Sequence, residues 1–366
     1  MEGDRIVVTP TKTYRIAVIA GDGIGPEVVE ASIPVLEAAA GRFGARLHWE
    51  RFPWGSDHYV AHGRMMPADA LDRLRGFDAI FFGAVGDPRL QDNLTLDGLL
   101  LPIRRGFDQY ACVRPAVLYP GVRCPLVGKA PESIDFVVVR ENTEGEYAQV
   151  GGVLYPGGPH EVAVQSGIFT RHGTERVIRF AFELARSRNR RRRVTSITKS
   201  NAQGFGMAFW DRVFVDVARD YPDVQTESLL VDAACMDFVR RPESFDVVVA
   251  SNLFGDILTD LSAAITGSLG LAPSANLNPA RTAPSMFEPV HGSAPDIAGR
   301  GVANPMAAML AGAMMLDFLG EVEAAQAIEA GVRAVLADGR TLTPDLGGTG
   351  TTRAVAEAVI ARRTSG

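Results

Sequence analysis

Two aspartates one helical turn apart are the first candidates for chemistry in this sequence. Asn252, Asp256 and Asp260 follow the apolar run 245–250 and form a narrow stripe beside an apolar helix face. With no cation between them on the stripe, two carboxylates about 6 Å apart repel by on the order of 3 kcal/mol at an effective dielectric of about 20. The stripe therefore indicates a bound cation or a basic partner, and Mg²⁺ or Mn²⁺ suits such oxygen ligands. A solvated acidic face is the alternative.

Three arginines are candidates for binding carboxylates. Arg104 lies in an expected helix, Arg114 precedes Pro115 at a strand end, and Arg140 closes the apolar strand 134–140. Each alone would more often be a surface ion pair. Together with an acidic stripe they suit a substrate with more than one carboxylate, because guanidinium groups bind carboxylates in bidentate fashion.

Further candidates are a lysine, a tyrosine and a loop. Lys199 follows the strand 194–198, and a lysine beside a metal can have its pKa lowered enough to act as a base. Tyr147 could return a proton, although spacing alone favours a structural role for both residues. The turn-rich loop 288–299 holds His291 and Asp296 and is a candidate ligand loop. Its acid could bind both ribose hydroxyls of an adenosine and would repel a 2′-phosphate.

Composition restricts the class of protein. The 366 residues predict two domains, and a net charge of −6 argues against nucleic-acid binding. Three scattered cysteines and no apolar N-terminal segment predict a cytoplasmic protein without disulfides or a zinc site. The apolar helix expected over 304–319 is too short to span a membrane. The arginine-rich run 188–193 is interpreted as a solvated helix end.

The elements alternate between strand and helix, which predicts an α/β fold on a largely parallel sheet. Residues 21–25 (GDGIG) form a tight strand–helix turn, but their spacing and the following proline exclude a standard Rossmann site. Residues 145–168 are expected to form a β-hairpin arm that pairs with another subunit. After residue 270 the chain is expected to be turn-rich. Strands are expected at 14–20, 47–52, 77–82, 110–117, 134–140, 194–199, 225–231 and 245–250. Helices are expected at 26–40, 67–75, 96–106, 173–187, 204–219, 232–240, 304–319, 322–336 and 351–363, and residues 251–260 are expected to form the first turns of another helix.

Six further motifs are specific in sequence: GDGIGPE (21–27), FDQY (107–110), VVVRENTEGEY (137–147), TKSN (198–201), ASNLFGDILTDL (250–261) and FEPVHGSAPDIAG (287–299). They resemble those of the metal-dependent β-decarboxylating hydroxyacid dehydrogenases, the isocitrate/isopropylmalate dehydrogenase family. The resemblance covers residue 14 to the C-terminus. Within the family the chain is most similar to the tartrate dehydrogenase/decarboxylase and D-malate dehydrogenase group, through LLLPIRRGFDQY, RENTEGEY and PSANLNP.

The resemblance implies a two-domain isopropylmalate-dehydrogenase-like fold, a homodimer with shared active sites, and oxidative decarboxylation of a malate-like acid with NAD and Mg²⁺ or Mn²⁺. Residues 1–109 and 267–366 would form the large domain, and 110–266 the small one. K⁺ is a plausible further cofactor, and a tetramer is an alternative to the dimer. The implied roles are Lys199 of the partner subunit as base and Tyr147 as proton donor; Arg104, Arg114 and Arg140 for the substrate carboxylates; Asp256 and Asp260, with Asp232 from the other subunit, for the metal; and His291, Gly292, Ser293, Ala294, Asp296, Ile297 and Asn304 for NAD.

Three departures bear on the substrate. Asp97 occupies the helix position that would face the substrate's variable group, where the tartrate group is expected to carry an aromatic residue and isopropylmalate enzymes a glutamate. Gly98 replaces the serine of isocitrate enzymes, and residues 202–206 also differ from the tartrate group. With Leu100 and Leu101, Asp97 would decide the substrate. Tartrate or D-malate is the expected substrate, 3-isopropylmalate is the alternative, and a catalytically silent regulatory subunit is a third hypothesis.

Overall fold

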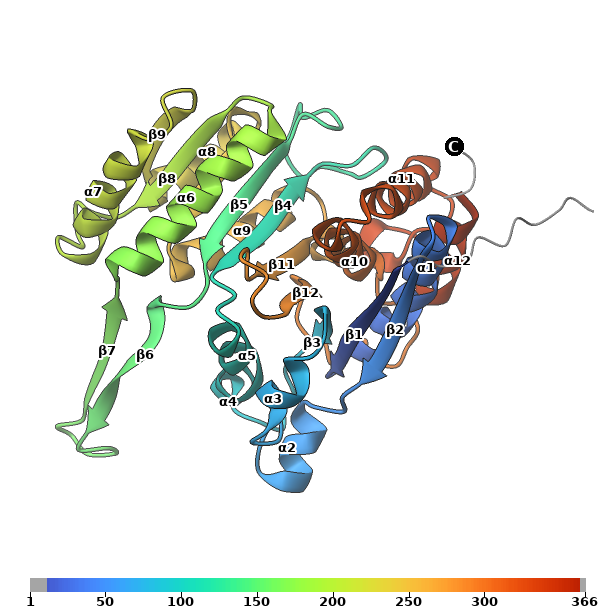
Figure 1. Ribbon diagram of the computed structural model, residues 1–366, viewed down its shortest axis with the longest axis horizontal. Helices are drawn as coiled ribbons and strands as arrows, with labels where there is room; N and C mark the ends of the chain where they lie inside the picture. Colours follow the sequence, from blue (N-terminus) through green and yellow to red (C-terminus); the bar gives the residue numbers. More distant parts are fainter. Residues whose placement is uncertain (1–11, 363–366) are drawn as a thin grey trace, which may run out of the picture.

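The computed structural model describes residues 12–362, which form an α/β fold on one ten-stranded sheet and a separate hairpin (Figure 1). The sheet order is β2-β1-β3-β12-β11-β4-β5-β10-β8-β9. The strands are β1 Lys12–Gly21, β2 Ala45–Arg51, β3 Ala79–Ala84, β4 Ala111–Val117, β5 Asp135–Glu141, β6 Gly145–Leu154, β7 Val162–Ile168, β8 Arg193–Thr198, β9 Gln225–Leu230, β10 Val247–Ala250, β11 Pro273–Leu277 and β12 Ser285–Pro289.

The sheet is parallel on both sides and antiparallel at its centre. Strand β4 runs antiparallel to β5 and β11, and β11 runs antiparallel to β12, whereas the other neighbours are parallel. This confirms the expected largely parallel sheet. The segment after residue 270, expected to be turn-rich, also contains two strands that were not expected, β11 and β12. Strands β11 and β12 have five residues each and are buried on both faces, so they show no alternation of apolar and polar residues.

The helices mostly follow the expected ranges. Helix α2 was not expected, and the helix expected over 67–75 is reduced to the short α3. The expected helix 96–106 begins with a π-helical turn at Leu96–Leu100, which links α4 to α5. The helices are α1 Gly25–Arg42, α2 Ser56–His62, α3 Ala70–Leu74, α4 Asp92–Thr95, α5 Leu101–Gly106, α6 Arg171–Arg188, α7 Gly206–Ala218, α8 Val231–Arg240, α9 Asn252–Ile265, α10 Met306–Leu319, α11 Val322–Asp338 and α12 Thr352–Arg362.

Each half of the sheet has its own apolar core. Strands β1, β3 and β12 pack against α1, α10, α11 and α12, while β5, β8 and β10 pack against α6 to α9 (Figure 1). Helix α10 is almost entirely buried, which confirms the expected core helix. Within residues 12–362 no helix combines the length and apolar character needed to cross a membrane. The expected domain boundaries stay a prediction, and residues 1–11 and 363–366 of the expected large domain lie outside the described residues.

The GDGIG turn joins β1 to α1 and anchors neighbouring loops. The Asp22 carboxylate accepts hydrogen bonds from the Ser56 amide at 2.8 Å, the Ser56 hydroxyl at 2.6 Å and the Gly86 amide at 3.0 Å. At Gly23, which has a φ of +56°, a Cβ would lie 2.0 Å from the Ser293 carbonyl oxygen. The glycine therefore allows close approach of the loop at 293, and residues 21–25 form the tight strand–helix turn that the sequence predicted.

Strands β6 and β7 form the expected hairpin arm outside the main sheet. Figure 1 shows it extending away from the rest of the ribbon. Its apolar side chains are exposed, which is unusual for a structure that must be stable in water. The exposed residues are Val150, Val153, Leu154, Tyr155, Val162 and Val164.

Candidate active site

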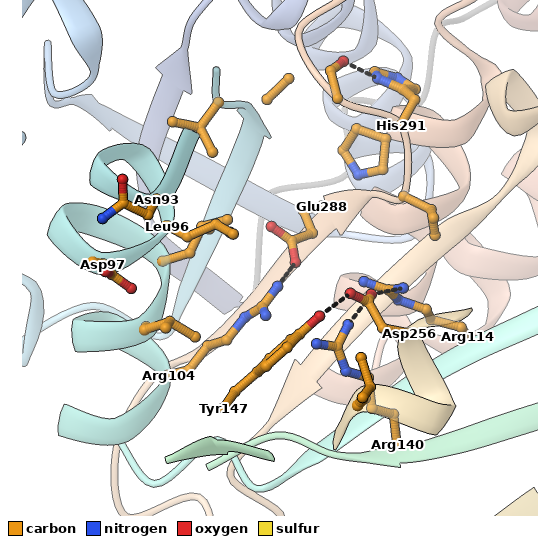
Figure 2. A pocket seen from close by; sticks show the side chains of 18 of the residues that line it. Asn93, Leu96, Asp97, Arg104, Arg114, Arg140, Tyr147, Asp256, Glu288 and His291 are labelled. Carbon is orange, nitrogen blue, oxygen red and sulfur yellow. Dashed lines mark hydrogen bonds and ion pairs between the residues drawn. The ribbon is translucent and has the colours of Figure 1, made fainter. Parts of the chain in front are cut away.

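A cavity of about 760 Å³ lies between the helix α5, the arm, helix α9 and the loop after β12. This volume suits a small substrate together with part of a cofactor. Figure 2 shows Asp97 and Arg104 on one side and Arg140 and Asp256 on the other. The predicted site residues that line it are Asp97, Leu100, Leu101, Arg104, Arg114, Arg140, Tyr147, Asp256, His291 and Gly292.

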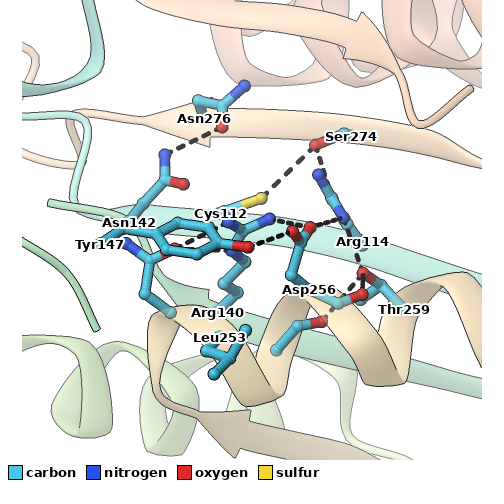
Figure 3. A network of polar contacts seen from close by, with 12 residues as sticks. Cys112, Arg114, Arg140, Asn142, Tyr147, Leu253, Asp256, Thr259, Ser274 and Asn276 are labelled. Carbon is cyan, nitrogen blue, oxygen red and sulfur yellow. Dashed lines mark hydrogen bonds and ion pairs between the residues drawn. The ribbon is translucent and has the colours of Figure 1, made fainter. Parts of the chain in front are cut away.

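Asp256 lies at the centre of a polar network (Figure 3). Its Oδ1 accepts from Nη1 of Arg140 and, at 3.2 Å, from Nη1 of Arg114, while its Oδ2 accepts from the Tyr147 hydroxyl at 2.9 Å. Burial alone would raise the pKa of Asp256, but the two guanidinium groups outweigh burial and lower it. The stripe therefore has basic partners, one of the two possibilities expected from the sequence, because β4 and β5 bring arginines from distant segments.

Arg140 is positioned by helix α9. It is 2% exposed, and its Nε and Nη2 donate to Oδ1 of Asn252 at 3.0 and 2.7 Å. A Cβ at Gly255 would lie 2.6 Å from the Cβ of Arg140, so this glycine allows strand β5 to approach the helix. Arg114 lies in the middle of β4 and not at a strand end, and it donates to the Thr259 hydroxyl at 2.7 Å.

Arg104 approaches the cavity from α5. Its Nη2 donates to Oε1 of the buried Glu288 at 2.7 Å. Its Nε is buried and has no hydrogen-bond partner among the described residues. Buried donors are nearly always satisfied, so this orphaned N–H indicates a ligand oxygen in the cavity.

Tyr147 is held in the cavity by its backbone and its hydroxyl. Nη2 of Arg105 donates to the Tyr147 carbonyl oxygen, and the hydroxyl donates to Asp256. Burial, reinforced by the Asp256 carboxylate, raises the pKa of Tyr147 to about 12. The hydroxyl therefore keeps its proton at neutral pH, as a proton donor requires.

Asp260 lies one turn beyond Asp256 but does not line the cavity. Partial burial and repulsion from Asp256 raise its pKa. Between residues 12 and 362 no three histidine, cysteine or acidic side chains are grouped to hold a metal ion. Asp256 and Asp260 therefore supply two carboxylates, and a complete cage needs a ligand from elsewhere.

Lys199 and Asp232 lie outside the cavity of their own chain. The Lys199 Nζ is 2.8 Å from Oδ1 of Asp232, and both side chains are partly exposed. The chain does not bring its predicted base and third metal ligand to its own Asp256. This arrangement is compatible with the expected exchange of these residues between two subunits.

The loop after β12 places His291 and Gly292 in the cavity. The Nδ1 of His291 bonds to the Gly292 carbonyl oxygen at 3.0 Å, and burial lowers its pKa, so the ring is neutral. Its Nε2 is buried without a partner among the described residues and is a free acceptor. The other predicted cofactor residues, Ser293, Ala294, Asp296, Ile297 and Asn304, do not line this cavity.

Two of these residues have clear structural contacts. The Ser293 carbonyl oxygen accepts from the Ile24 amide at 2.8 Å. Asn304 donates to Asp345 and accepts from the Met306 amide, each at 3.0 Å. Their predicted roles toward the cofactor stay predictions.

Comparison with known proteins decides the family. The isocitrate/isopropylmalate dehydrogenase family profile matches residues 15–359. The chain belongs to this family. It is 54% identical over 355 residues to D-malate dehydrogenase (decarboxylating) of Escherichia coli K12, covering 95% of this chain and 98% of that protein. It is 52% identical over 349 residues to the probable tartrate dehydrogenase/decarboxylase TtuC of Agrobacterium vitis, covering 95% of each.

The structures agree with this assignment. Isocitrate dehydrogenase from Methylococcus capsulatus superposes with a TM-score of 0.86 at 37% identity, covering 96% of this chain and 99% of that one. The isopropylmalate-dehydrogenase-like fold is thereby confirmed. As a member of this family, the chain is a decarboxylating hydroxyacid dehydrogenase.

Several residues of this dehydrogenase's site were not singled out from its sequence. Glu288 binds Arg104, and Glu146 accepts from the Ser251 hydroxyl at 2.8 Å and the Leu253 amide at 3.2 Å, which fixes the start of α9. Arg105 holds the arm. These residues lie in or beside quoted motifs, but only tertiary structure gives them partners.

Proposed function

We propose that this protein oxidises and decarboxylates a malate-like 2-hydroxy acid, tartrate or D-malate, with NAD⁺ and Mg²⁺ or Mn²⁺. The observation that carries the proposal is the convergence of Arg104, Arg114 and Arg140 on one cavity beside Asp256. Three buried guanidinium groups carry three positive charges, whereas their partners Asp256 and Glu288 carry two negative charges. A bound dicarboxylate would supply the further anionic partners that buried guanidinium groups require. The names of the relatives, D-malate dehydrogenase and tartrate dehydrogenase/decarboxylase, support this substrate class.

The donor set fits a hard divalent cation. Asp256 and Asp260 offer carboxylate oxygens one helical turn apart, and Asp232 of a second copy would complete the set. Such an ion would polarise the substrate hydroxyl and stabilise the enolate left by decarboxylation. Burial and, after it, repulsion from Asp256 raise the pKa of Asp260, and a bound cation would offset this repulsion.

The loop 287–299 fits the adenosine half of NAD. The free acceptor His291 Nε2 suits an exocyclic amine of a base, and the exposed Asp296 suits ribose hydroxyls and would repel a 2′-phosphate. Gly292, Ser293, Ala294, Ile297 and Asn304 complete the proposed cofactor set. Bound NAD⁺ would accept the hydride from the substrate.

The chain's own residues would divide the remaining tasks. Arg104, Arg114 and Arg140 hold the substrate carboxylates, and the buried Nε of Arg104 gains its missing acceptor. Lys199 of the second subunit takes the hydroxyl proton. Tyr147, protonated at neutral pH, returns a proton to carbon after CO₂ leaves.

A homodimer joined through the exposed arms would supply the shared residues. The residues 1–109 with 267–366, and 110–266, are proposed as its large and small domains. The arm's exposed apolar side chains support this assembly.

A substrate panel tests the proposal. Purified protein with NAD⁺, Mn²⁺ and K⁺ is assayed for NADH formation with D-malate, tartrate, 3-isopropylmalate and isocitrate. We expect turnover of D-malate, tartrate or both, and its loss after chelation and recovery with added Mn²⁺. Turnover of 3-isopropylmalate alone would overturn the substrate assignment, and turnover without a divalent ion would overturn the metal. Omitting K⁺ tests the monovalent ion.

3-Isopropylmalate is the second candidate because Leu100 and Leu101 line the cavity with apolar surface. Isocitrate is disfavoured by packing at Gly98, where a Cβ would lie 2.6 Å from Cγ of Met65. A serine at this position would require Met65 to move.

A further inference from the structure

Gln149 on the arm contacts the helix that faces the cavity. Its Nε2 donates to Oδ1 of Asp97, and its Oε1 accepts from Nη1 of Arg105 at 2.9 Å. The partners fix the orientation of the amide, because reversing it would oppose two acceptors at Asp97 and two donors at Arg105. Both Gln149 and Asp97 line the cavity.

The backbone of Gln149 has an unusual conformation, which indicates that surrounding contacts fix the position of this residue. Its φ is +56°, in the left-handed region that non-glycine residues rarely adopt. The pairing of β6 with β7 is also irregular between Gly145 and Val150. This irregularity turns the side chain toward the helix α5 and away from the regular arm, and strained positions of this kind persist where surrounding contacts support them.

The pair lies on the same side of the cavity as Arg104. Asp97 lies in the π-helical turn Leu96–Leu100 and Arg104 in α5, which follows it directly, and both residues line the cavity. Helical side chains lean toward the N-terminus, which directs Arg104 back toward Asp97. Figure 2 shows both residues on this helical segment, with Arg104 extending toward Glu288.

We propose that Gln149 is a specificity-determining residue that forms, with Asp97, a subsite for a hydroxyl group on the carbon next to the one oxidised. This inference rests on the proposed function. The hydrogen bond between Gln149 and Asp97 uses one N–H of the amide and one oxygen of the carboxylate. The second N–H of Gln149 remains as a donor and Oδ2 of Asp97 as an acceptor, and neither atom has a hydrogen bond within residues 12–362. A hydroxyl can satisfy both atoms at once.

The same pair disfavours other substituents. A carboxylate offers only acceptors and would be repelled by Asp97, and an alkyl group would leave both polar atoms without partners. D-malate carries only hydrogen at this position, so Gln149 and Asp97 would bind water in place of a substrate hydroxyl. The enzyme is therefore a tartrate-type dehydrogenase that uses D-malate less efficiently.

The test is a double-mutant cycle on the ratio of kcat/KM for tartrate to that for D-malate. We expect Gln149→Leu and Asp97→Ala each to lower this ratio about tenfold, the effect of one hydrogen bond in a binding site. The double variant should lower it little further, because the two side chains act as a unit. Gln225→Leu is the matched control, since this exposed glutamine also accepts from an arginine, Arg193, outside the cavity.

The outcomes separate the subsite from the proposed function. Wild-type protein inactive on both substrates would refute the proposed function. Activity on both with a ratio unchanged in either single variant, or with fully multiplicative losses in the double variant, would overturn the role of Gln149. If Gln149→Leu fails to form the wild-type oligomer, an unchanged ratio in Asp97→Ala alone overturns the subsite, and a tenfold fall supports it.

Discussion

Lys199 and Asp232 form an ion pair, with 2.8 Å between Nζ and Oδ1, outside the cavity that contains Asp256. The hydrogen bond from Lys199 lowers the pKa of Asp232, which favours the carboxylate form of this aspartate. Both residues are partly exposed and carried on the half of the sheet next to the arm. A second copy could therefore receive them, and the proposed catalytic centre needs them from there.

Replacing Tyr147 with Phe should remove the proton donor and leave the substrate in place. We expect kcat to fall by about 10²–10⁴ while the substrate Kd changes only a few-fold. Steady-state kinetics and binding titration measure the two effects. Tyr59→Phe, in α2 and outside the cavity, is the control and should behave as wild type. Wild-type kcat in Tyr147→Phe would show that another group donates the proton.

Helix α1 contains two glycines with opposite packing. At Gly25 a Cβ would lie 2.2 Å from the Ala20 carbonyl oxygen, whereas at Gly41 it would meet nothing within 4 Å. Gly25→Ala should lower the free energy of unfolding by about 2 kcal/mol or more. Gly41→Ala should raise it by about 0.5 kcal/mol, because alanine loses less backbone entropy. Urea unfolding measures both, and equal effects would contradict this account of the β1–α1 turn.

Glu321 ties the first strand to the end of α10. Burial would raise its pKa, but hydrogen bonds from Tyr14 at 2.7 Å and Lys12 at 2.9 Å outweigh burial and lower it below 4.5. A depressed folded-state pKa stabilises the fold above pH 4.5, and this contribution is lost as the pH falls through the folded value. Glu321→Gln should therefore cost about 1–3 kcal/mol at pH 7 and less at acid pH.

Urea unfolding at pH 7 and in acid measures this difference. Glu357→Gln removes an exposed pair with Arg353 and should cost about 0.5 kcal/mol or less at both pH values. A cost for Glu321→Gln that does not change with pH would show that its charge is not what stabilises the fold.

The fold was largely predictable because its elements carry strong local signals. The apolar run of β10 and the amphipathic α9 were located closely, and the Gly-rich segment before α1 was correctly predicted to be a tight strand–helix turn. Strands β11 and β12 were missed, since five-residue strands with proline and asparagine, buried on both faces, have no periodicity. The π-helical turn of Asp97 has no sequence signal of its own.

The site was predictable in its residues but not in its pairings. Motif resemblance identified Arg114, Arg140 and Asp256, yet nothing in the sequence showed that both arginines contact Asp256, because it lies more than 100 residues from each of them. Likewise Gln149 lies in an arm whose composition indicates only a hairpin. Its contact with Asp97 depends on a backbone irregularity that appears only in the folded chain.

Complementation between two inactive variants tests the shared catalytic centre most directly. Lys199→Met and Asp256→Asn are tagged differently, co-expressed, and the mixed dimer is purified and assayed with NAD⁺, Mn²⁺ and tartrate or D-malate. In a dimer with exchanged residues, one site carries both substitutions and the other carries none. The account predicts inactive parents and a mixed dimer with about half of the wild-type activity. A mixed dimer as inactive as its parents would contradict it, because Lys199 and Asp256 would then act within the same subunit.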